Sequence, residues 1–470
     1  MSQDIVVIGA GPAGLAAAYE LSEQGQPSLV LEKDATIGGL SRTVVYKGFR
    51  CDIGGHRFFT KSDYVDQLWH KVLGPDFLRR PRLSRIYTDG KFYNYPLQIG
   101  NVLANLGVGR SLAVTASYLA AKLRPFKKDD TFTQWVSNRF GRKLFNMFFK
   151  AYTEKIWGIS TDELSGDWAA QRIRNLSAGK AILNALGLKG RKVASLIEQF
   201  DYPALGPGQM YEAMARQAAD KGAAVMLSQP VVAVERAGGR IVAAMASNGK
   251  STQRYPVGKG LFSSMPLDEM VLALTPAAPN EVLEAARSLT YRSLITVNLL
   301  LNQAEITPDT WIYIHDSKVR AGRMQLYKNW SPHMVPNPGQ SVIGLEYFST
   351  VGDDLWNLSD EKLTAIAKDD LGAMNFVNGS AVFDSFVVRY AKAYPVYKAG
   401  YAAALRTIRQ FLGGIDNLYP IGRYGQFRYN NMDHSILTAQ LSVQKMNGAA
   451  TDPWSVNVEE AGYLEEKKTG

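Results

Sequence analysis

Residues 5–14, with the sequence IVVIGAGPAG, decide the fold of this chain. A short apolar strand leads into a glycine turn, an alanine-rich stretch predicts a helix, and Glu32 ends the next apolar run. Gly9 permits a tight turn, Gly11 lets the backbone approach a pyrophosphate, and Gly14 lets the helix pack close to the strand. Glu32 stands where a carboxylate holds a ribose hydroxyl. The segment therefore predicts an α/β domain that binds a dinucleotide.

Two further glycine pairs follow, Gly38-Gly39 and Gly54-Gly55. A nicotinamide-dinucleotide domain does not need them. The first pair, continued as Leu-Ser-Arg42, resembles the GG-x-x-R extension of flavoproteins of the glutathione reductase and amine oxidase type. The resemblance implies FAD as the cofactor, with Gly39 beside the pyrophosphate and Arg42 on its phosphates. The alternative for Arg42 is a solvated surface position.

Composition sets wide limits. A chain of 470 residues can hold two or three domains and a large core. The single cysteine, Cys51, excludes an internal disulfide framework and a CxxC redox pair, and with five scattered histidines we expect no metal site. The first apolar stretch belongs to the nucleotide-binding strand and helix, so we expect no secretory signal and a cytoplasmic location.

The net charge of +10 favours an anionic substrate or an acidic membrane surface. We expect no nucleic-acid partner, because the chain has no compact basic tract and no nucleic-acid motif. Residues 103–123 are mostly apolar, but Arg110 and Lys122 argue against a membrane-spanning helix. Two interpretations stay open for this stretch and the basic residues after it: a core helix, or an interfacial patch that touches a membrane or a membrane-bound glycosyltransferase.

The expected fold is a Rossmann-type FAD-binding domain interrupted by a helical insertion and a mixed β-sheet substrate domain. We assign the FAD-binding domain to residues 1–61, 197–268 and 390–458, the helical insertion to 62–196, the substrate domain to 269–389 and a flexible tail to 459–470. Local patterns predict a hairpin at Ala237–Arg240, strands at Gly260–Pro266, Leu294–Leu301, Val342–Tyr347, Phe383–Tyr390 and Asp416–Tyr419, and a helix near Asp433.

Four short islands resemble segments of UDP-galactopyranose mutases, in the same chain order. They are Gly55–Phe59, Lys150–Gly158, Tyr291–Leu294 and Gly422–Asp433. Together with the FAD fingerprint they identify a divergent member of the superfamily of amine oxidase-like and protoporphyrinogen oxidase-like flavoproteins. The resemblance implies that Gly55 and His56 lie beside the flavin, and that Gly422, Arg423 and Met432 return the chain to it.

A sugar nucleotide fits these islands physically, because a diphosphate in a partly buried cleft needs arginines. The candidate substrate-binding residues are Tyr152, Trp157, Arg172, Arg174, Arg292, Arg323, Tyr429 and Asn431, and the catalytic candidates are His56 and Arg292. Tyr152 and Trp157 are alternatively core aromatics, and His56 is alternatively a structural hydrogen-bond donor. Arg172 and Arg174 are two apart on an expected helix, so only one of them is expected to reach the substrate.

In the mutases that this chain resembles, N5 of reduced FAD attacks the anomeric carbon and the sugar changes from pyranose to furanose without net redox. The resemblance implies the same reaction here, in polysaccharide or glycoconjugate biosynthesis, with NAD(P)H as a candidate reductant. Asn431 departs from the family's aspartate, and residues 202–210 look closer to protoporphyrinogen oxidase-like flavoproteins. Two alternatives therefore remain: an FAD-dependent oxidoreductase of a sugar, lipid or tetrapyrrole, and a non-catalytic flavoprotein partner of a glycosyltransferase. The sequence leaves the oligomeric state open.

Overall fold

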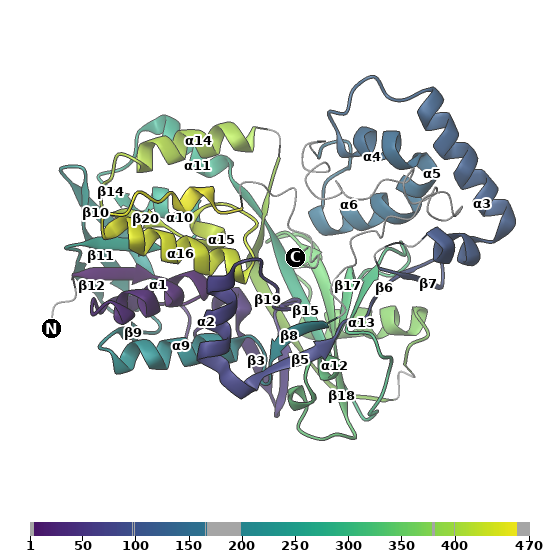
Figure 1. Ribbon diagram of the computed structural model, residues 1–470, viewed down its shortest axis with the longest axis horizontal. Helices are drawn as coiled ribbons and strands as arrows, with labels where there is room; N and C mark the ends of the chain where they lie inside the picture. The colour runs from purple at the N-terminus through teal and green to yellow at the C-terminus, as the bar shows by residue number, and fades with distance from the viewer. Residues whose placement is uncertain are drawn as a thin grey trace.

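The computed structural model describes residues 4–457, except 96, 98, 165, 167–198, 378–380 and 399. The described residues form a nucleotide-binding layer, a mixed sheet and a helical lobe made of α3 to α6 (Figure 1). The helices are α1 (Pro12–Glu23), α2 (Asp63–Leu73), α3 (Ile99–Leu123), α4 (Phe132–Phe140), α5 (Arg142–Phe145), α6 (Ala151–Trp157), α9 (Gly208–Asp220), α10 (Leu267–Leu272), α11 (Asn280–Ser288), α12 (Tyr327–Trp330), α13 (Asp360–Ala373), α14 (Tyr401–Leu412), α15 (Gly422–Gly425) and α16 (Met432–Met446).

The strands are β1 (Ile5–Ile8), β2 (Leu29–Leu31), β3 (Thr43–Tyr46), β4 (Phe49–Asp52), β5 (Phe77–Pro81), β6 (Ser84–Thr88), β7 (Lys91–Asn94), β8 (Gln199–Pro203), β9 (Ala224–Met226), β10 (Val231–Ala237), β11 (Arg240–Ser247), β12 (Thr252–Pro256), β13 (Gly260–Ser263), β14 (Leu274–Thr275), β15 (Thr290–Leu301), β16 (Trp311–Ile314), β17 (Arg323–Leu326), β18 (Ser341–Ser349), β19 (Val382–Val396) and β20 (Leu418–Pro420).

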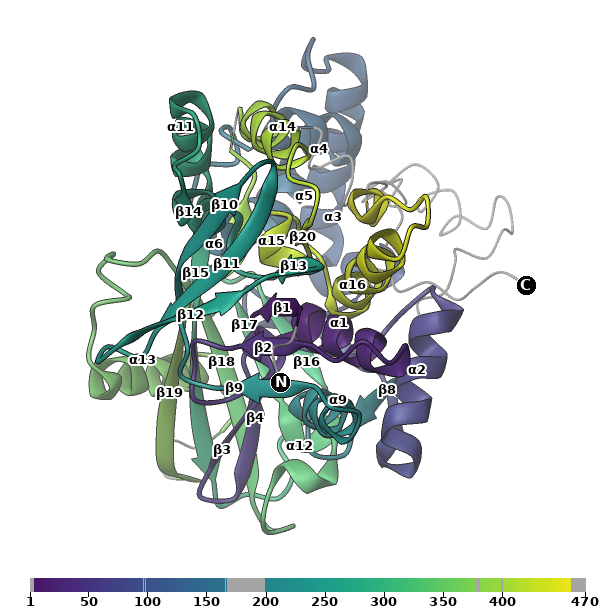
Figure 2. The same ribbon diagram turned by 90° about the vertical axis from the view of Figure 1, so that its left-hand side faces the viewer.

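The nucleotide-binding sheet is parallel, in the order β20-β13-β1-β2-β9. All four residues of β1 are buried, as expected for a parallel strand covered on both faces. Helices α1, α9 and α16 pack on one face, and the small sheet β12-β11-β10-β14 packs on the other (Figure 2). The expected α/β class with a Rossmann-type sheet is confirmed.

The local predictions around this sheet are also confirmed. The glycine pair of the expected hairpin joins β10 to β11 in an antiparallel pair, and β13 returns to pair with β1. Strand β20 pairs with β13, and α16 begins at Met432, one residue before the expected Asp433. Hairpin and strand signals are local, which is why the sequence alone sufficed for these elements.

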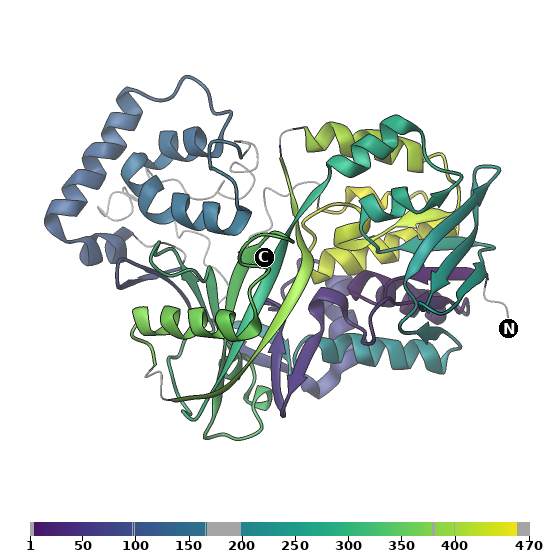
Figure 3. The same ribbon diagram turned by 180° about the vertical axis from the view of Figure 1, so that it is seen from behind.

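The mixed sheet has the order β19-β15-β18-β17-β16-β6-β7 and lies between the nucleotide-binding layer and the helical lobe (Figure 3). The three expected long strands are confirmed as β15, β18 and β19, which pair antiparallel. Helix α13 covers one face through Leu363 and Leu371. Alternation along β16 and β17 turns Trp311, Tyr313 and Arg323 to the other face, which borders a cavity.

Two expectations about segment boundaries are wrong. Residues 62–196 are not helical throughout, because β5, β6 and β7 lie within them. Strands β6 and β7 extend the mixed sheet, β5 pairs with β8, and α2 packs beside α1 and α9. The boundary expected at 389 falls inside the continuous strand β19. The remaining domain division stays a prediction, and the expected tail lies outside the described residues.

Within the described part of the chain, no helix combines the length and the apolar character that crossing a bilayer requires. The same residues include no group of three histidine, cysteine or carboxylate side chains arranged to hold a metal ion.

Candidate functional site

A cavity of about 960 Å³ lies where the three regions meet. Its volume is at the upper end of the usual range for ligand pockets. The nucleotide-binding layer contributes the glycine turns, the mixed sheet contributes β16, β17 and β19, and the helical lobe contributes α4, α6 and the residues between α5 and α6. Of the predicted site residues, the cavity wall includes Gly9, Gly11, Glu32, Gly39, Arg42, Gly55, His56, Tyr152, Trp157, Arg323, Gly422, Arg423, Tyr429, Asn431 and Met432.

The glycine turns at the nucleotide end have no room for side chains. Gly9 has a φ of 95°, and a Cβ on Gly14 would stand 1.8 Å from the carbonyl oxygen of Gly9. A Cβ on Gly39 would stand 3.2 Å from the Cα of Gly11, so two bare backbone turns face each other. Gly11 begins α1 without any side-chain cap, which leaves the helix N-terminus open to the cavity for an anionic group.

Glu32 and Arg42 flank this turn. The Glu32 carboxylate accepts hydrogen bonds from the backbone N–H groups of Ala10 (2.6 Å) and Asp34 (2.9 Å), and burial raises the pKa of Glu32. The Arg42 guanidinium pairs with Asp34 at 2.7 Å. Arg42 therefore borders the cavity, but an ion pair with Asp34 holds it.

The loop at residues 54–56 fits against the mixed sheet. A Cβ on Gly55 would stand 1.8 Å from the ring of Trp311, so only glycine fits there. Burial, then the charges of Arg423 and Arg323, lower the pKa of His56 to about 3. His56 is therefore neutral near pH 7, which favours the structural alternative over an imidazolium acid.

The segment 422–432 lines the cavity beside the start of α1. Gly422 has a φ of 75°, and a Cβ there would stand 2.7 Å from Ala13 of α1. Arg423 donates to the backbone oxygens of Asn430 (2.8 Å) and Ala393 (3.0 Å), and thereby joins this segment to β19. Asn431 is the residue that precedes α16, with Met432 at its first position, and both line the cavity.

An ion pair and a hydrogen bond hold Arg323 in the cavity wall. Its Nη2 lies 2.5 Å from Glu346 and donates to the Tyr394 hydroxyl at 2.7 Å. Its Nε is buried without a hydrogen-bond partner among the described residues, as is Nε1 of Trp311. Because buried N–H groups are normally paired, both atoms indicate a place for a ligand or water.

The aromatic candidates line the cavity around Arg323. Tyr152 stacks on His315 with ring centroids 4.3 Å apart, and Tyr429 stacks on Tyr394 at 5.5 Å. Trp157 is only 7% exposed and packs in the adjacent core cluster while also bordering the cavity. Trp157 thus combines the two alternatives that the sequence left open.

Arg292 does not line the cavity, contrary to the prediction of a catalytic and substrate-binding role. Its guanidinium donates to the carbonyl of Ile156 (3.0 Å), the carbonyl of Phe348 (2.9 Å) and the hydroxyl of Thr350 (2.7 Å). A Cβ on Gly158 would stand 2.5 Å from the guanidinium carbon. Two of the resembling islands, those of Arg292 and Gly158, therefore meet in a structural clamp between β15 and the end of α6.

Arg172 and Arg174 lie outside the described residues. Sequence reasoning missed other cavity residues: Arg57, Arg82, His315 and Tyr394. Arg57 directly follows His56 in a resembling island, so a signal for it was present, whereas the loop of Arg82 carries none. Burial and the nearby Lys155 charge lower the pKa of His315 to about 3, so it is neutral as well.

Lys155 is a second clamp on the helical lobe. Its Nζ donates to the carbonyl oxygens of Ile314, Asp316, Val319 and Ala321, at 2.8 to 3.1 Å. Burial lowers the pKa of Lys155 to about 8. This ammonium group holds the turn between β16 and β17 against α6.

The cavity is electropositive. The wall includes eight arginine and lysine residues and four aspartate and glutamate residues, counted over the described part of the chain. This excess of basic over acidic residues agrees with the net charge of +10 and favours anionic ligands.

Comparison with known proteins places the chain in a family. It belongs to the flavin-containing amine oxidoreductases, because the model of that family matches residues 12–447. The family implies FAD. The glycine turn, the open N-terminus of α1 and the Glu32 carboxylate fit its dinucleotide part.

Relatives of two kinds are found among curated proteins. A probable UDP-galactopyranose mutase of Klebsiella pneumoniae is 25% identical over 181 residues, which are 35% of this chain and 43% of the relative. A putative flavin-containing monoamine oxidase of Mycobacterium tuberculosis is 27% identical over 248 residues, 50% of this chain and 52% of the relative. The chain thus spans about half the length of these relatives.

Solved structures match over nearly the whole chain. A crystal structure of reduced UDP-galactopyranose mutase aligns with a TM-score of 0.84 at 21% identity, over 97% of this chain and 98% of the other. A putative protoporphyrinogen oxidase from Exiguobacterium sp. aligns with a TM-score of 0.71 at 18% identity, over 95% and 99%. The expected resemblance is confirmed in the fold, and the chain is a divergent flavoenzyme of the amine oxidase superfamily.

Proposed function

We propose that this flavoenzyme acts on a nucleoside diphosphate sugar, most simply as a pyranose–furanose mutase. The observation that supports the proposal best is a group of arginines at the cavity end formed by the mixed sheet and the helical lobe. Arg57 and Arg323 both lie 5.2 Å from the ring centroid of Trp311. Arg82 lies 5.9 Å from the ring of Tyr95, which is 4.7 Å from Tyr313.

These arginines suit a diphosphate. A diphosphate carries about two negative charges, and planar guanidinium groups bind such oxygens in pairs. The Nε of Arg323 is an unused donor in the described structure, and the Glu346 carboxylate fixes the orientation of the guanidinium. A protonated amine would meet repulsion from the same groups, so the cavity favours an anionic substrate over an amine.

Each part of the wall has a role in this proposal. The FAD, once bound, would supply the nucleophilic N5 in its reduced form. Arg57, Arg82 and Arg323 would hold the diphosphate, both before and after it leaves the sugar. The hydroxyls of Tyr152 and Tyr429 would donate to the same phosphates, and Trp157 offers a flat apolar face to the sugar. His56 would act as a neutral hydrogen-bonding group beside the cofactor.

A second candidate is an FAD-dependent oxidoreductase. Membership in the flavin-containing amine oxidoreductases and the likeness to a putative monoamine oxidase favour it. The two candidates differ in whether the reaction consumes an oxidant, and in whether nucleoside diphosphates bind.

The test is a titration of the flavin-loaded protein with UDP, read by flavin absorbance in the oxidised and dithionite-reduced states. We expect salt-sensitive binding that is lost in Arg57→Ala and Arg82→Ala but kept in Arg254→Ala. Arg254 on β12 is a matched control, because it pairs with Glu235 of β10, outside the cavity.

UDP-sugars are then screened for isomerisation by chromatography. The mutase proposal expects turnover only with reduced flavin and no steady consumption of reductant or oxygen. Absence of UDP binding in both states, with oxygen uptake on an uncharged substrate, would establish the oxidoreductase instead.

A further inference from the structure

Helix α3 exposes an apolar stripe on the outer surface of the helical lobe. The helix is kinked at Gly107, whose φ is 72°. Beyond the kink, Val108, Leu112, Leu119 and Leu123 are 80%, 67%, 54% and 82% exposed. Figure 1 shows α3 at the outer edge of the lobe, on the side of the molecule opposite β12.

The stripe follows the helical period. Val108 and Leu112 are four residues apart, as are Leu119 and Leu123, and Leu112 and Leu119 are seven apart, so all four share one face. The opposite face is the one that packs: Val114 is buried in a core cluster with Phe148, which Val102 and Leu106 join from before the kink. Single exposed apolar residues are ordinary, but four large ones on one helix face indicate an interaction surface.

Basic side chains continue the stripe at its C-terminal end. Lys122, Arg124, Lys127 and Lys128 are all exposed, whereas Arg110 lies on another face of the helix and pairs with Asp89 at 3.3 Å. Arg124 and Lys127 form no ion pair with any residue that the structure describes, and Lys128 lies 3.6 Å from the exposed Asp130. The surface therefore combines apolar side chains with positive charge that is mostly uncompensated.

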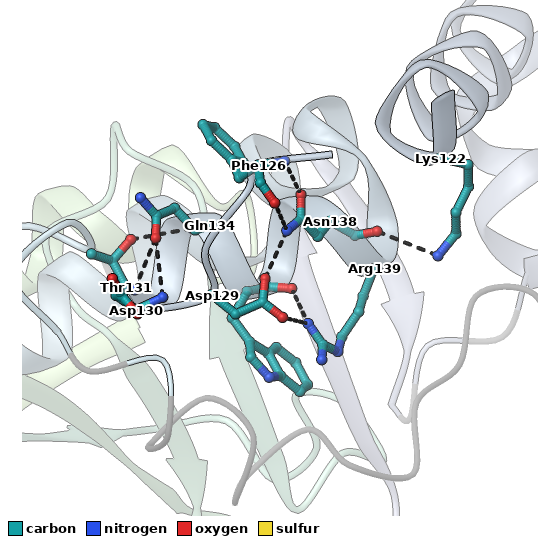
Figure 4. Close-up of polar contacts among 9 residues, drawn as sticks. Lys122, Phe126, Asp129, Asp130, Thr131, Gln134, Asn138 and Arg139 are labelled. Carbon is teal, nitrogen blue, oxygen red and sulfur yellow. Dashed lines mark hydrogen bonds and ion pairs between the residues drawn. The ribbon is translucent and has the colours of Figure 1, made fainter. Parts of the chain in front are cut away.

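The segment that carries these charges is anchored to α4 (Figure 4). The Asn138 side chain accepts a hydrogen bond from the backbone N–H of Phe126 (2.7 Å) and donates to the Phe126 carbonyl (3.1 Å). It also donates to the Asp129 carboxylate at 2.7 Å. Arg139 pairs with Asp129 at 2.8 Å, and Thr131 with Gln134 forms a capping box at the start of α4. The basic segment thus keeps a fixed position beside the apolar stripe.

We propose that this surface, the α3 stripe with Lys122, Arg124, Lys127 and Lys128, docks peripherally on an anionic lipid bilayer. An interfacial helix inserts its apolar face at the headgroup boundary while basic residues bind acidic headgroups. A second copy of the chain fits less well. In a two-fold dimer the same patch meets itself, which would place these cations against one another.

The test is co-sedimentation of the flavin-loaded protein with vesicles. One set of vesicles is phosphatidylcholine alone, and the other is phosphatidylcholine with about 30% phosphatidylglycerol. We expect binding to the anionic vesicles only, weakened at high salt. A triple variant, Arg124→Gln, Lys127→Gln and Lys128→Gln, should bind about a hundredfold more weakly, since each basic residue near an anionic surface contributes about a fivefold factor.

Matched controls separate this surface from net charge and general hydrophobicity. Lys250→Gln, Arg254→Gln and Arg287→Gln together make the same charge change at exposed positions of other elements. Leu119→Ser with Leu123→Ser should also weaken binding by at least about tenfold, whereas Val232→Ser with Leu272→Ser, which are 52% and 46% exposed, should not.

Flavin absorbance and the melting temperature check that each variant folds. Failure of the parent protein to bind anionic vesicles, or equal losses in the control variants, would overturn the proposal. The proposal would also be overturned if vesicle binding is absent and sedimentation equilibrium shows a concentration-dependent dimer that the leucine variant abolishes. UDP binding is measured in parallel, so this outcome is independent of the proposed function.

Discussion

Arg292→Ala should destabilise the fold while leaving the affinity for UDP nearly unchanged. Arg292 is 9% exposed, and its guanidinium satisfies the buried carbonyl of Phe348 and the partly buried carbonyl of Ile156, whereas Thr350 is exposed and can bond water instead. Each carbonyl left unpaired costs about 1.5–2 kcal/mol, so the free energy of unfolding should fall by about 3–4 kcal/mol. The unfolding entropy of 470 residues is on the order of 1 kcal/mol/K, which makes the expected drop in Tm about 3–4 °C.

Differential scanning calorimetry and the UDP titration measure the two quantities on the same sample. Arg57→Ala is the paired comparison, because Arg57 lines the cavity and should show the reverse pattern: a weaker Kd for UDP and a small change in Tm. An unchanged Tm in Arg292→Ala, together with a Kd raised roughly 30-fold or more, would refute the structural assignment, since a loss of that size belongs to an arginine paired with the ligand.

Three further outcomes are expected. Gly55→Ala should lower flavin content and stability by about 1–3 kcal/mol, because its Cβ would overlap Trp311, whereas Gly372→Ala, with open space, should not; flavin absorbance and Tm decide. Burial raises the pKa of Asp52 to about 8, so the folded protein retains a proton that the unfolded chain releases near pH 3.8. Stability should therefore fall as the pH rises from about 4 to 8, and Asp52→Asn should flatten the plot of Tm against pH; an unchanged slope would contradict this. His56→Gln should lower kcat without changing the shape of the pH–rate profile between about pH 5 and 8, because the pKa of His56 is about 3. If the variant lost a titration step near pH 6 from this profile, the prediction would be contradicted.

The nucleotide end could be predicted from the sequence because its geometry is local. The φ of Gly9, the contact of Gly14 with Gly9 and the open start of α1 all arise within ten residues of chain. The same holds for the hairpin between β10 and β11. Turns and strand–helix junctions carry their own residue signals, so no distant partner is needed to recognise them.

The substrate end depends on partners far apart in sequence. Arg292 and Arg323 were both candidate substrate-binding residues, yet strand pairing turns Arg323 to the cavity and Arg292 to α6. Strands β5 and β7 are short and β5 carries two arginines, and they are strands because β8 and β6 pair with them. The residues within a strand do not by themselves determine which face of the sheet a side chain occupies or which strand pairs with it.

The ammonium group of Lys155 has a consequence for motion. Its four carbonyl partners surround it as oxygens surround an alkali cation in a crown ether, and Arg292 donates to the carbonyl of Ile156, the next residue of the same helix. Tyr152 on α6 and His315 after β16 therefore travel as one rigid body. Any opening of the enzyme to admit substrate must hinge elsewhere, because swinging α6 away from the sheet would break both clamps at once.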